Sequence, residues 1–417
     1  MIIFSHPTGN ANSRAAVAGI AEAGLLSKFH TSIAAFPNSI IDHLSRIGPL
    51  SEIRRRRFNS ELKHFTQTSP WREVGRFAAS KAGLTNLVRH EIGPFCIDAV
   101  YQGIDRKMSY TLKHAVKKQV KAVYSYEDTA LFSFRESKRL GLQCIYDLPI
   151  GYWRTAHRLL EIEKARWPEW ASTLTGFKDS VAKLERKDEE LALADIIFVA
   201  SQFTANTLKD FPGRLGNIQV IPYGFPTVSK MRLNNSRPLN RSLKLLFVGG
   251  LSQRKGLANL FAAVEKFGDH IELTIVGGKV NHIITPALDN ALSKHRWIPT
   301  LPHDEILKLM REHDVLVFPS LFEGFGLVIT EAMSQGTPVI TTERTAGPDL
   351  IEHGRNGWLI EAGSTEAIKE TLEELLYKPE SIAEAGREAA ETASRRPWEV
   401  YGREVTDAIK KHLSNLH

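Results

Sequence analysis

The stretch SLFEGFGLVITEAMSQGTPVI, residues 320–340, places two carboxylates, Glu323 and Glu331, eight positions apart with glycines between them. The apolar run DVLVFPS ends just before it and helical spacing begins near Leu327, so we predict a strand, a glycine turn and a helix. Backbone N–H groups at such a turn, together with the positive end of the helix dipole, favour a phosphate. The spacing predicts a nucleotide-sugar site, with Glu323 at sugar hydroxyls and Glu331 at a ribose. The alternative is that both are solvated surface acids.

Apolar runs alternate with helical patterns through the second half of the chain, as in LKLLFVGG, GLANLFAAVEKF, IELTIVGG and HDEILKLMREH. This order is typical of βαβ units around a parallel sheet that helices cover on both faces. In the first half we predict strands at IIFSHPT, TSIAAFP, CIDAVYQG, AVYSYE, QCIYDLP and DIIFVAS, and helices at SRAAVAGIAEAGLL and SQFTANTLKDF. The fold prediction is α/β, with two Rossmann-like, doubly wound domains facing a cleft.

A linker is predicted at residues 225–243, which are rich in Pro, Ser, Asn and Arg and lack periodicity. It separates an N-terminal domain, residues 1–224, from a C-terminal domain, residues 244–396. The final segment, residues 397–417, is predicted to be a helix because its apolar residues follow helical spacing: Trp398, Val405, Ile409 and Leu413.

The composition is that of a globular protein: 417 residues, 42% hydrophobic and 24% charged. The chain has only two cysteines, which excludes a disulfide scaffold and a four-thiolate metal site. The first residues, MIIFSHPTGN, lack the pattern of a signal peptide, and no apolar run approaches the roughly 20 residues needed to span a bilayer. We expect a cytoplasmic protein that is soluble or peripheral at the inner face of the membrane.

Nearly all of the net charge of +7 comes from residues 52–90, which hold nine Lys or Arg and three acids. This block includes Arg54, Arg55, Arg56 and Arg57 and is interleaved with aromatic residues. It predicts an anionic membrane surface or a phosphorylated acceptor as partner, unless it is simply a solvated helical face. Nucleic acid is disfavoured because no recognition-helix, zinc-finger or RNA-binding pattern accompanies the charge.

Several segments together resemble the retaining GT-B glycosyltransferases of family four, also called glycosyltransferase group one. PSLFEGFGLVITEAMSQGTPVI resembles the family signature, LFVGGLSQRKGLANLF its glycine-rich turn ending in Lys-Gly, and TAGPDLIEHGRNGWLIEAG the stretch that follows the acid pair. LADIIFVASQFTANTL and VIPYG resemble the end of the first domain, so the resemblance is specific from about Ala194 to Gly363. It implies a GT-B fold whose last helix crosses back to the first domain, and a metal-independent reaction.

The resemblance also implies a role for each matching residue. Glu323 contacts the donor sugar, Glu331 holds the ribose, and Lys255 neutralises the diphosphate leaving group. Arg254 supplies the charge of an arginine that the family has at Gly250, or is an exposed loop cation. The turn that cradles the diphosphate consists of Gly324, Phe325, Gly326 and Leu327.

The N-terminal domain offers Asp147, at the end of a predicted strand, as a catalytic acid at the reaction centre or as a turn or cap residue. Glu127 and Asp128 compete for the same role, and Gly9 is placed to approach the donor phosphates. The chain departs from the family pattern at two more positions of the cleft floor, Tyr223 and Pro226. Three tryptophans are predicted either to line an acceptor groove or to pack between domains: Trp153, Trp167 and Trp170.

The leading hypothesis is a retaining glycosyltransferase of bacterial-type polysaccharide or glycolipid synthesis. It would need no cofactor or metal, and its partners would be a nucleotide-sugar donor and a saccharide or lipid-linked acceptor. A non-hydrolysing nucleotide-sugar epimerase, or a decayed sugar-nucleotide binding protein, are the alternatives. Retention of Glu323, Glu331 and Lys255 argues against decay, and a dehydrogenase is disfavoured because the first strand lacks a G-x-G-x-x-G turn.

Overall fold

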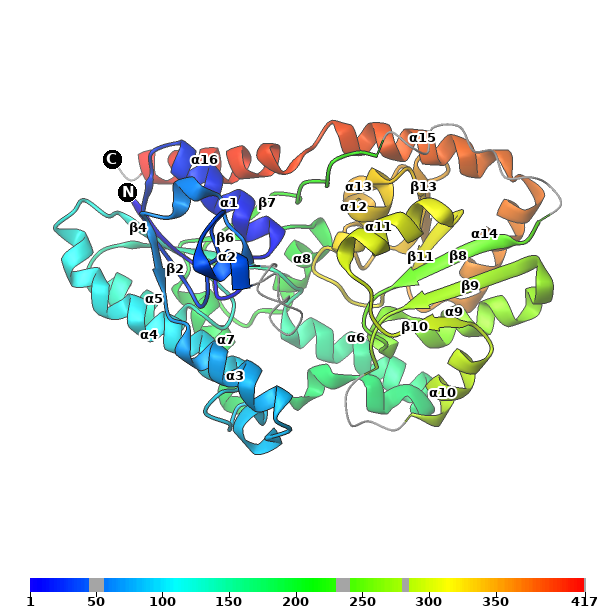
Figure 1. Cartoon of the computed structure of the whole chain (residues 1–417), viewed down its shortest axis with the longest axis horizontal. Coiled ribbons are helices and arrows are strands. Elements are labelled where there is room, and N and C mark those ends of the chain that lie inside the picture. The colour runs from blue at the N-terminus through cyan, green and yellow to red at the C-terminus, as the bar shows by residue number, and fades with distance from the viewer. Residues whose placement is uncertain (45–55, 230–240, 280–284, 416–417) are drawn as a thin grey trace.

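Two parallel β-sheets lie side by side and form the framework of the molecule (Figure 1). The computed structural model describes residues 1–44, 56–229, 241–279 and 285–415. The seven-stranded sheet of the N-terminal domain has the order β3-β2-β1-β4-β5-β6-β7, and the six-stranded sheet of the C-terminal domain has the order β10-β9-β8-β11-β12-β13. The strands are β1 (Ile2–Ser5), β2 (Leu26–Thr31), β3 (Thr66–Thr68), β4 (Ala122–Tyr126), β5 (Gln143–Leu148), β6 (Ile196–Val199), β7 (Asn217–Val220), β8 (Leu243–Val248), β9 (Ile271–Val276), β10 (Arg296–Ile298), β11 (Val315–Phe318), β12 (Val339–Thr342) and β13 (Gly357–Ile360).

Each sheet reverses its direction of growth beside its first strand. In the first sheet β1 lies between β2 and β4, and in the second β8 lies between β9 and β11. Such a reversal leaves a crevice at the carboxyl ends of the two central strands, where ligands of doubly wound sheets bind. The predicted pair of Rossmann-like domains is confirmed.

Helices cover both sheets, which explains the uninterrupted apolar runs of the central strands. Every residue of β4 and of β11 is buried, because such strands have no solvent-facing side. The helices are α1 (Ala11–Glu22), α2 (Ile40–Leu44), α3 (Trp71–Lys81), α4 (Ile97–Val116), α5 (Leu131–Arg139), α6 (Trp153–Arg166), α7 (Val181–Leu193), α8 (Gln202–Thr207), α9 (Leu257–Val264), α10 (Pro286–Ser293), α11 (His303–Glu312), α12 (Leu327–Ser334), α13 (Gly347–Leu350), α14 (Thr365–Tyr377), α15 (Glu380–Ser394) and α16 (Trp398–Ser414). Short 3-10 helices are η2 (Ser60–Leu62), η3 (Thr85–Val88), η4 (Pro168–Thr173), η5 (Thr175–Lys178), η6 (Leu208–Asp210), η7 (Gln253–Lys255) and η8 (Glu265–His270).

Two of the predicted strands of the first half are wrong. The run CIDAVYQG begins the 20-residue helix α4, because its apolar positions Val100 and Ile104 continue at helical spacing to Met108 and Leu112, all of them buried. The run TSIAAFP contributes only Thr31, the last residue of β2. The strands predicted at IIFSHPT, AVYSYE, QCIYDLP and DIIFVAS correspond to β1, β4, β5 and β6.

The last helix crosses from the C-terminal domain and packs against α1 of the N-terminal domain, as the resemblance implied (Figure 1). Val405 and Ile409 of this helix are fully buried. The two helices meet at small residues: a Cβ added to Gly402 would lie 2.5 Å from the carbonyl oxygen of Ala15, and one added to Gly19 would lie 2.4 Å from that of Gly402. Only residues without a side chain allow this approach.

The first crossing between the domains follows β7 and runs beside the second. The N–H of Phe225 donates to the carbonyl of Arg396 at 2.8 Å, and Phe225 also forms an isolated β-bridge with Pro397. Part of the predicted linker, residues 230–240, lies outside the described residues.

A third connection consists of α6 and η4, which belong to the first half of the chain but pack on the C-terminal domain. Trp170, which is 5% exposed, stacks on Phe261 at 5.9 Å between ring centroids. The N–H of Gln253 donates to Thr173 Oγ1 at 2.9 Å, and its side-chain amide donates to Glu163 Oε2 at 3.2 Å. Trp170 therefore packs between the domains, which was one of the two roles predicted for it.

We predict that Gly402→Ala lowers the free energy of unfolding by about 1–3 kcal/mol, because the added methyl group forces α16 away from α1. Urea unfolding followed by circular dichroism measures the change. Gly176→Ala is the matched control, since a Cβ there meets nothing within 4 Å, and it should change stability by no more than about 0.5 kcal/mol. Equal effects of the two substitutions would contradict the close packing.

Candidate functional site

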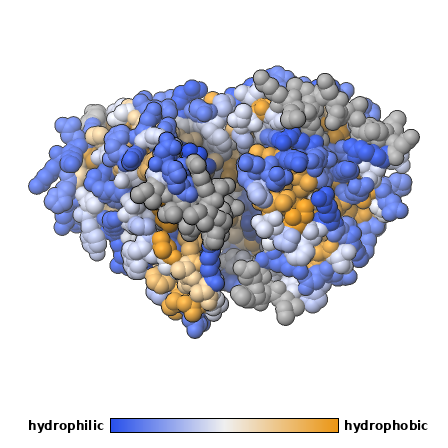
Figure 2. Space-filling view, in the orientation of Figure 1, coloured by the Kyte–Doolittle hydropathy of each residue, from blue (hydrophilic) through white to orange (hydrophobic). Residues whose placement is uncertain are grey.

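A cavity of about 550 Å³ lies between the two sheets, at the carboxyl ends of the strands where both reverse direction. In Figure 2 a hollow separates the two halves of the molecule. Residues that follow β1 and β4 line one wall, and residues that follow β8 and β11 line the other. The lining consists of His6, Pro7, Thr8, Asn10, Asn12, Tyr101, Tyr126, Glu127, Pro149, Tyr223, Val248, Gly249, Gly250, Arg254, Lys255, Phe318, Glu323, Phe325, Gly326, Leu327 and Val328.

The turn between β11 and α12 is part of the C-terminal wall of the cavity. Gly326 is the N-terminal cap of α12 and has φ +87°, a left-handed conformation that a side chain would strain. A Cβ there would also lie 2.9 Å from the ring of Phe318. Leu327 and Val328 of the first turn of α12 line the cavity, so the positive end of this helix faces it.

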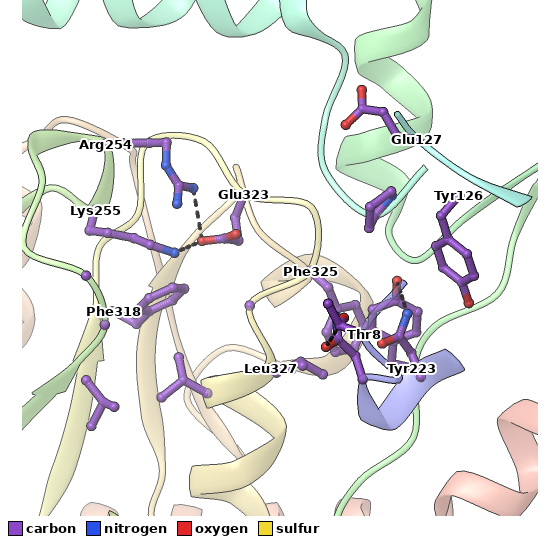
Figure 3. Close-up of a pocket in the computed structure, with 18 of the residues that line it drawn as sticks. Thr8, Tyr126, Glu127, Tyr223, Arg254, Lys255, Phe318, Glu323, Phe325 and Leu327 are labelled. Carbon is purple, nitrogen blue, oxygen red and sulfur yellow. Dashed lines mark hydrogen bonds and ion pairs between the residues drawn. The ribbon is translucent and has the colours of Figure 1, made fainter. Parts of the chain in front are cut away.

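Two cations meet the carboxylate of Glu323 above this turn (Figure 3). The Lys255 ammonium is in contact with Glu323 Oε2, and Arg254 Nη1 lies 3.3 Å from the same oxygen. Arg254 Nη1 also donates to the carbonyl of Phe322 at 2.7 Å. The turn that carries both cations rests against the end of β11, because a Cβ on Gly256 would lie 2.1 Å from the carbonyl oxygen of Pro319.

Burial governs the charges of this cluster. It lowers the pKa of Arg254 to about 10, which leaves the guanidinium charged at neutral pH. Burial and the neighbouring Arg254 both act to lower the pKa of Lys255, whereas the Glu323 carboxylate in contact with Nζ acts to keep the ammonium charged. An anion that enters the cavity therefore finds two positive groups already held in place.

The N-terminal wall presents His6 and Tyr126 from the ends of β1 and β4. His6 Nδ1 accepts hydrogen bonds from the N–H groups of Thr8 and Gly9 at 3.1 and 2.7 Å, so the ring proton belongs on Nε2. Burial and the charges of Arg56 and Arg14 lower the pKa of His6 to about 3, which makes the ring neutral at physiological pH.

Glu127 is the acid of this wall and lies across the cavity from the cation cluster (Figure 3). Its Oε1 is 3.6 Å from Nζ of Lys187 on α7, and its side chain is 10% exposed. Burial raises the pKa of Glu127, and the Lys187 ammonium opposes this rise. Asp128 turns away with φ +68° and pairs with Arg186 at 2.9 Å, so of the two neighbouring acids only Glu127 lines the cavity.

Comparison with known proteins identifies the C-terminal domain. Residues 233–392 match the family described as glycosyl transferases group 1. Over these residues the chain is similar to the group 1 glycosyl transferases. Its relatives include the capsular polysaccharide biosynthesis glycosyltransferase CapM of Staphylococcus aureus, 27% identical over 54% of this chain and 65% of CapM. Another is the amylovoran biosynthesis glycosyltransferase AmsK of Erwinia amylovora, 31% identical over 34% of this chain and 38% of AmsK. The chain thus spans less than two thirds of the length of either curated relative.

Solved structures extend the likeness over both domains. Sucrose-phosphate synthase from Thermosynechococcus elongatus superimposes with a TM-score of 0.65 at 17% identity, over 99% of each chain. HepE of Anabaena in complex with UDP-glucose superimposes with a TM-score of 0.62 at 16% identity, over 98% of this chain and 99% of HepE. The expected GT-B fold is confirmed.

The structure brings together most of the residues predicted for the donor side of the site. Lys255, Arg254 and Glu323 form one cluster, and three residues of the turn line the cavity beside it: Phe325, Gly326 and Leu327. Arg254 is therefore not an exposed loop cation, because only 29% of its side chain is accessible and its guanidinium donates to the carbonyl of Phe322 within the site.

Two predicted donor residues lie next to the cavity without lining it. Glu331 is on α12, where its side chain is 21% exposed and its Oε1 lies 3.1 Å from His303 Nε2. Gly9 has φ +73° and uses its N–H to cap His6, so its contribution is to shape the loop. A direct approach of Gly9 to a phosphate stays a prediction.

Gly324 joins the two walls. A Cβ on this residue would lie 1.9 Å from the carbonyl oxygen of Pro149 in the N-terminal domain. The hydroxyls of Ser201 and Thr204, also from that domain, donate to the carbonyl of Gly324 at 2.6 and 2.8 Å. Gly324 is therefore an interdomain contact and not a lining residue of the cavity.

Asp147 lies on β5, is 2% exposed and does not line the cavity. Its carboxylate accepts a hydrogen bond from the hydroxyl of Tyr124 at 2.7 Å. Burial raises the pKa of Asp147 to about 7. Asp147 therefore does not line the cavity, whereas Glu127, which follows the neighbouring strand, does.

Tyr223, one of the departures from the family pattern, lines the cavity and contacts residues of both domains. Its ring lies 4.8 Å from that of Phe325 and 5.2 Å from that of Tyr401 on α16, and its hydroxyl accepts a hydrogen bond from Asn12 at 3.1 Å. A tyrosine there connects the glycine turn with the crossing helix. The structure gives no comparable account of Pro226.

Sequence reasoning missed several residues of the N-terminal wall, among them His6, Asn12, Tyr101 and Tyr126. The signal available for His6 and Tyr126 was their place at the end of an apolar strand, because strand ends meet at one edge of a parallel sheet. Tyr101 lies on α4, which was predicted as a strand, so its direction could not be anticipated.

Away from the cavity, His90, Glu91 and Asp179 place one ligand atom each within 4.8 Å of one another. Their carboxylates already have partners, since Glu91 accepts from the N–H of Ser180 at 2.9 Å and Asp179 from Lys183 at 3.1 Å. These bonds fix the start of α7.

The proposed basic surface at residues 54–57 needs correction at Arg56. This guanidinium is buried, bonds to Glu73 and donates to the carbonyl of Pro7 at 3.0 Å, so it does not face a membrane. Arg57 is 54% exposed at its side chain, and Arg54 and Arg55 lie outside the described residues. Among the described residues, no helix combines the length and apolarity needed to cross a bilayer.

We predict that Asp147→Asn flattens the pH dependence of stability between about pH 4 and 7. The folded protein holds a proton on Asp147 that the unfolded chain, with a pKa of about 3.9, releases earlier. The stabilisation from this group is thus fully present below about pH 4 and is lost as the pH rises through about 7. Urea unfolding at several pH values measures the difference between wild type and variant.

The control for this experiment is Asp407→Asn, an acid that is 74% exposed on α16. It should shift stability by a constant amount across the range. A constant difference for Asp147→Asn as well would contradict the raised pKa.

Proposed function

We propose that the chain is a retaining glycosyltransferase, which transfers a sugar from a nucleotide-diphosphate-sugar donor to an acceptor hydroxyl. The observation that carries this proposal is the cluster of Lys255, Arg254 and Glu323 near the start of α12. This cluster lines the cavity between the two sheets. Two cations, a helix N-terminus and a carboxylate that can accept from sugar hydroxyls are the groups that a diphosphate sugar requires.

The donor diphosphate is proposed to lie at the N-terminus of α12. Backbone N–H groups of Phe325, Gly326 and Leu327 would donate to it, and Lys255 would exchange its carboxylate partner for a phosphate oxygen. The Glu323 carboxylate, freed from that contact, would then accept hydrogen bonds from the sugar. Because the cations are held before the donor arrives, little reorganisation accompanies the build-up of negative charge on the leaving group.

The chemical step is proposed to occur on one face of the sugar. The bond from the anomeric carbon to the diphosphate oxygen breaks while the bond to the acceptor oxygen forms on the same side. The acceptor proton passes to the departing phosphate oxygen, so atoms and charge balance without a protein base. Retention of configuration follows from this geometry.

The acceptor is proposed to bind along the N-terminal wall. Glu127 faces the cation cluster across the cavity, and Lys187 holds its position. The neutral His6 ring, with its proton on Nε2, can donate a hydrogen bond to an acceptor oxygen. Both groups suit polyhydroxylated ligands, which need donors and acceptors more than charge.

Polysaccharide or glycolipid synthesis is the proposed setting, supported by the names of CapM and AmsK among the relatives. A UDP-linked donor is the first to test, since HepE binds UDP-glucose. We also propose that the transfer takes place at the inner face of a membrane. It is proposed to need no metal or cofactor. An epimerase is not favoured, because both relatives are named as glycosyltransferases.

The proposal is tested by screening nucleotide sugars with different bases for thermal stabilisation, followed by product analysis with saccharide and lipid-linked acceptors. A donor at 100 times its dissociation constant should stabilise the protein by about 2.7 kcal/mol. Retention is read from the anomeric configuration of the product by NMR. Inverted product, or hydrolysis and epimerisation without transfer, would refute the proposed reaction.

We predict that Lys255→Ala lowers turnover at least about 100-fold, because the variant loses a fixed cation next to the leaving group. Steady-state kinetics with the donor found by the screen measures the loss. The matched control is Lys294→Ala, an ion-paired surface lysine of the same domain that is 51% exposed, and it should retain wild-type turnover. If Lys255→Ala stays within a few-fold of wild type, the charge comes from elsewhere, and Arg254→Ala is the next variant.

We predict that Glu331→Gln weakens donor binding about 10-fold or more, as expected when a carboxylate loses a charge-assisted hydrogen bond to a ribose hydroxyl. Stability should change little, because the side chain is partly exposed and its bond with His303 lies at the surface. Calorimetric titration compares it with Glu305→Gln, an exposed acid on α11. Wild-type affinity of Glu331→Gln would exclude the ribose contact.

A further inference from the structure

A patch of large apolar side chains is exposed at the tip of the N-terminal domain. Five of the thirteen exposed large apolar residues of the described chain fall within residues 71–97. We call this set the α3 tip surface: Trp71 (61% exposed), Val74 (52%), Leu84 (52%), Ile92 (69%) and Ile97 (56%). Figure 2 shows a hydrophobic patch at the lower left end of the molecule, where Figure 1 places the end of α3.

Local contacts connect the start of α3 with the segment that contains Phe95. Trp71, at the start of α3, meets Phe95 edge to face at 5.9 Å between ring centroids. Gly75, one turn along, leaves room for Phe95, since a Cβ there would lie 2.6 Å from that ring. The N–H of Phe95 donates to the carbonyl of Leu87 in η3 at 2.9 Å. Local packing therefore fixes Trp71, which remains 61% exposed, beside Phe95.

All three acids of residues 71–98 turn away from this surface. Glu73 is 2% exposed and bonds to Arg56 and Arg76. Glu91 accepts a hydrogen bond from the N–H of Ser180 at 2.9 Å. Asp98 is 5% exposed and accepts from Arg186 at 2.7 Å.

Cations, in contrast, point outward around the apolar patch. Lys81 and Arg89 are exposed, and the guanidinium of Arg72 lies over the ring of Trp71 at 4.8 Å. Within residues 71–98 the exposed charged side chains are thus basic. Such a surface is complementary to an anionic partner with an apolar layer beneath its charges.

The form of the patch distinguishes between a bilayer and a protein. Protein interfaces usually have a continuous apolar core and are depleted in lysine. Here exposed Trp71 and Ile92 share one segment with exposed Lys81 and Arg89, a combination that is typical of residues at a membrane interface. We infer that the α3 tip surface docks the chain on a bilayer that contains anionic lipids. This inference rests on the membrane setting included in the proposed function, for which it names the docking surface, and it does not depend on the transfer reaction.

Flotation of the full chain with vesicles tests the inference. The protein should float with vesicles of phosphatidylcholine and phosphatidylglycerol at low salt, and not with phosphatidylcholine alone. Binding should weaken as salt rises, because exposed charges are screened beyond a Debye length of about 10 Å at 0.1 M. Absence of flotation with the anionic vesicles at low salt would overturn the proposal.

Variants locate the surface. The double variant Trp71→Ser with Ile92→Ser should lower the vesicle partition coefficient at least tenfold. Lys81→Gln and Arg89→Gln should each lower it about fivefold, which corresponds to the ~1 kcal/mol expected for one basic residue at an anionic surface. The matched controls are Tyr377→Ser on α14, which is 86% exposed, and Arg403→Gln on α16, and both should bind like wild type.

Circular dichroism and nucleotide binding of each variant show that the fold is intact. If the folded double variant floats like wild type, the α3 tip surface is not the docking site. If the wild-type chain instead self-associates without lipid and Ile92→Ser abolishes this, the patch is a protein interface and the proposal is wrong.

Discussion

The contact between Gly324 and Pro149 is the constraint on which the site depends. The carbonyl oxygen of Pro149, at the end of β5, would lie 1.9 Å from any Cβ at position 324, and the hydroxyls of Ser201 and Thr204 bind the carbonyl of Gly324. Backbone from one domain is thus seated directly on backbone from the other. The residues on either side of Gly324 inherit this placement: Glu323 is directed at Lys255 and Phe325 at Tyr223. A side chain at this position would separate the two walls of the cavity.

The two domains that meet at this contact contribute different chemical groups to the cavity. The C-terminal wall is built of cations and the start of a helix, and it suits a diphosphate. The N-terminal wall is built of tyrosines, a neutral histidine and Glu127, which suit hydroxyl groups. Crossing segments hold the walls in register: α16 packs on α1, and α6 with η4 packs on the C-terminal domain. Asp147 is buried in β5, where its carboxylate accepts a hydrogen bond from Tyr124 and burial raises its pKa to about 7.

The C-terminal half of this picture could be predicted from the sequence because its groups are close together along the chain. Glu323, the glycine turn and α12 form one strand-turn-helix unit, and Arg254 with Lys255 belongs to the equivalent unit after β8. The N-terminal wall depends on strand order, since His6 and Glu127 are far apart in sequence and meet only because β1 pairs with β4. Asp147 does not reach the cavity, because it pairs with Tyr126 inside the sheet, one residue before Glu127, which lines the cavity. The α4 segment was misread because a short apolar run fits a strand as well as a helix.

The central claim is that a nucleoside diphosphate binds between the start of α12 and the cation pair. A crystal structure with the nucleoside diphosphate that most stabilises the protein tests this most directly. The account predicts phosphate oxygens within hydrogen-bond distance of Lys255 Nζ and of the N–H groups of Phe325 to Leu327, with the Lys255–Glu323 contact opened. A nucleotide bound elsewhere, or a diphosphate in this cavity that leaves Lys255 on Glu323, would contradict it.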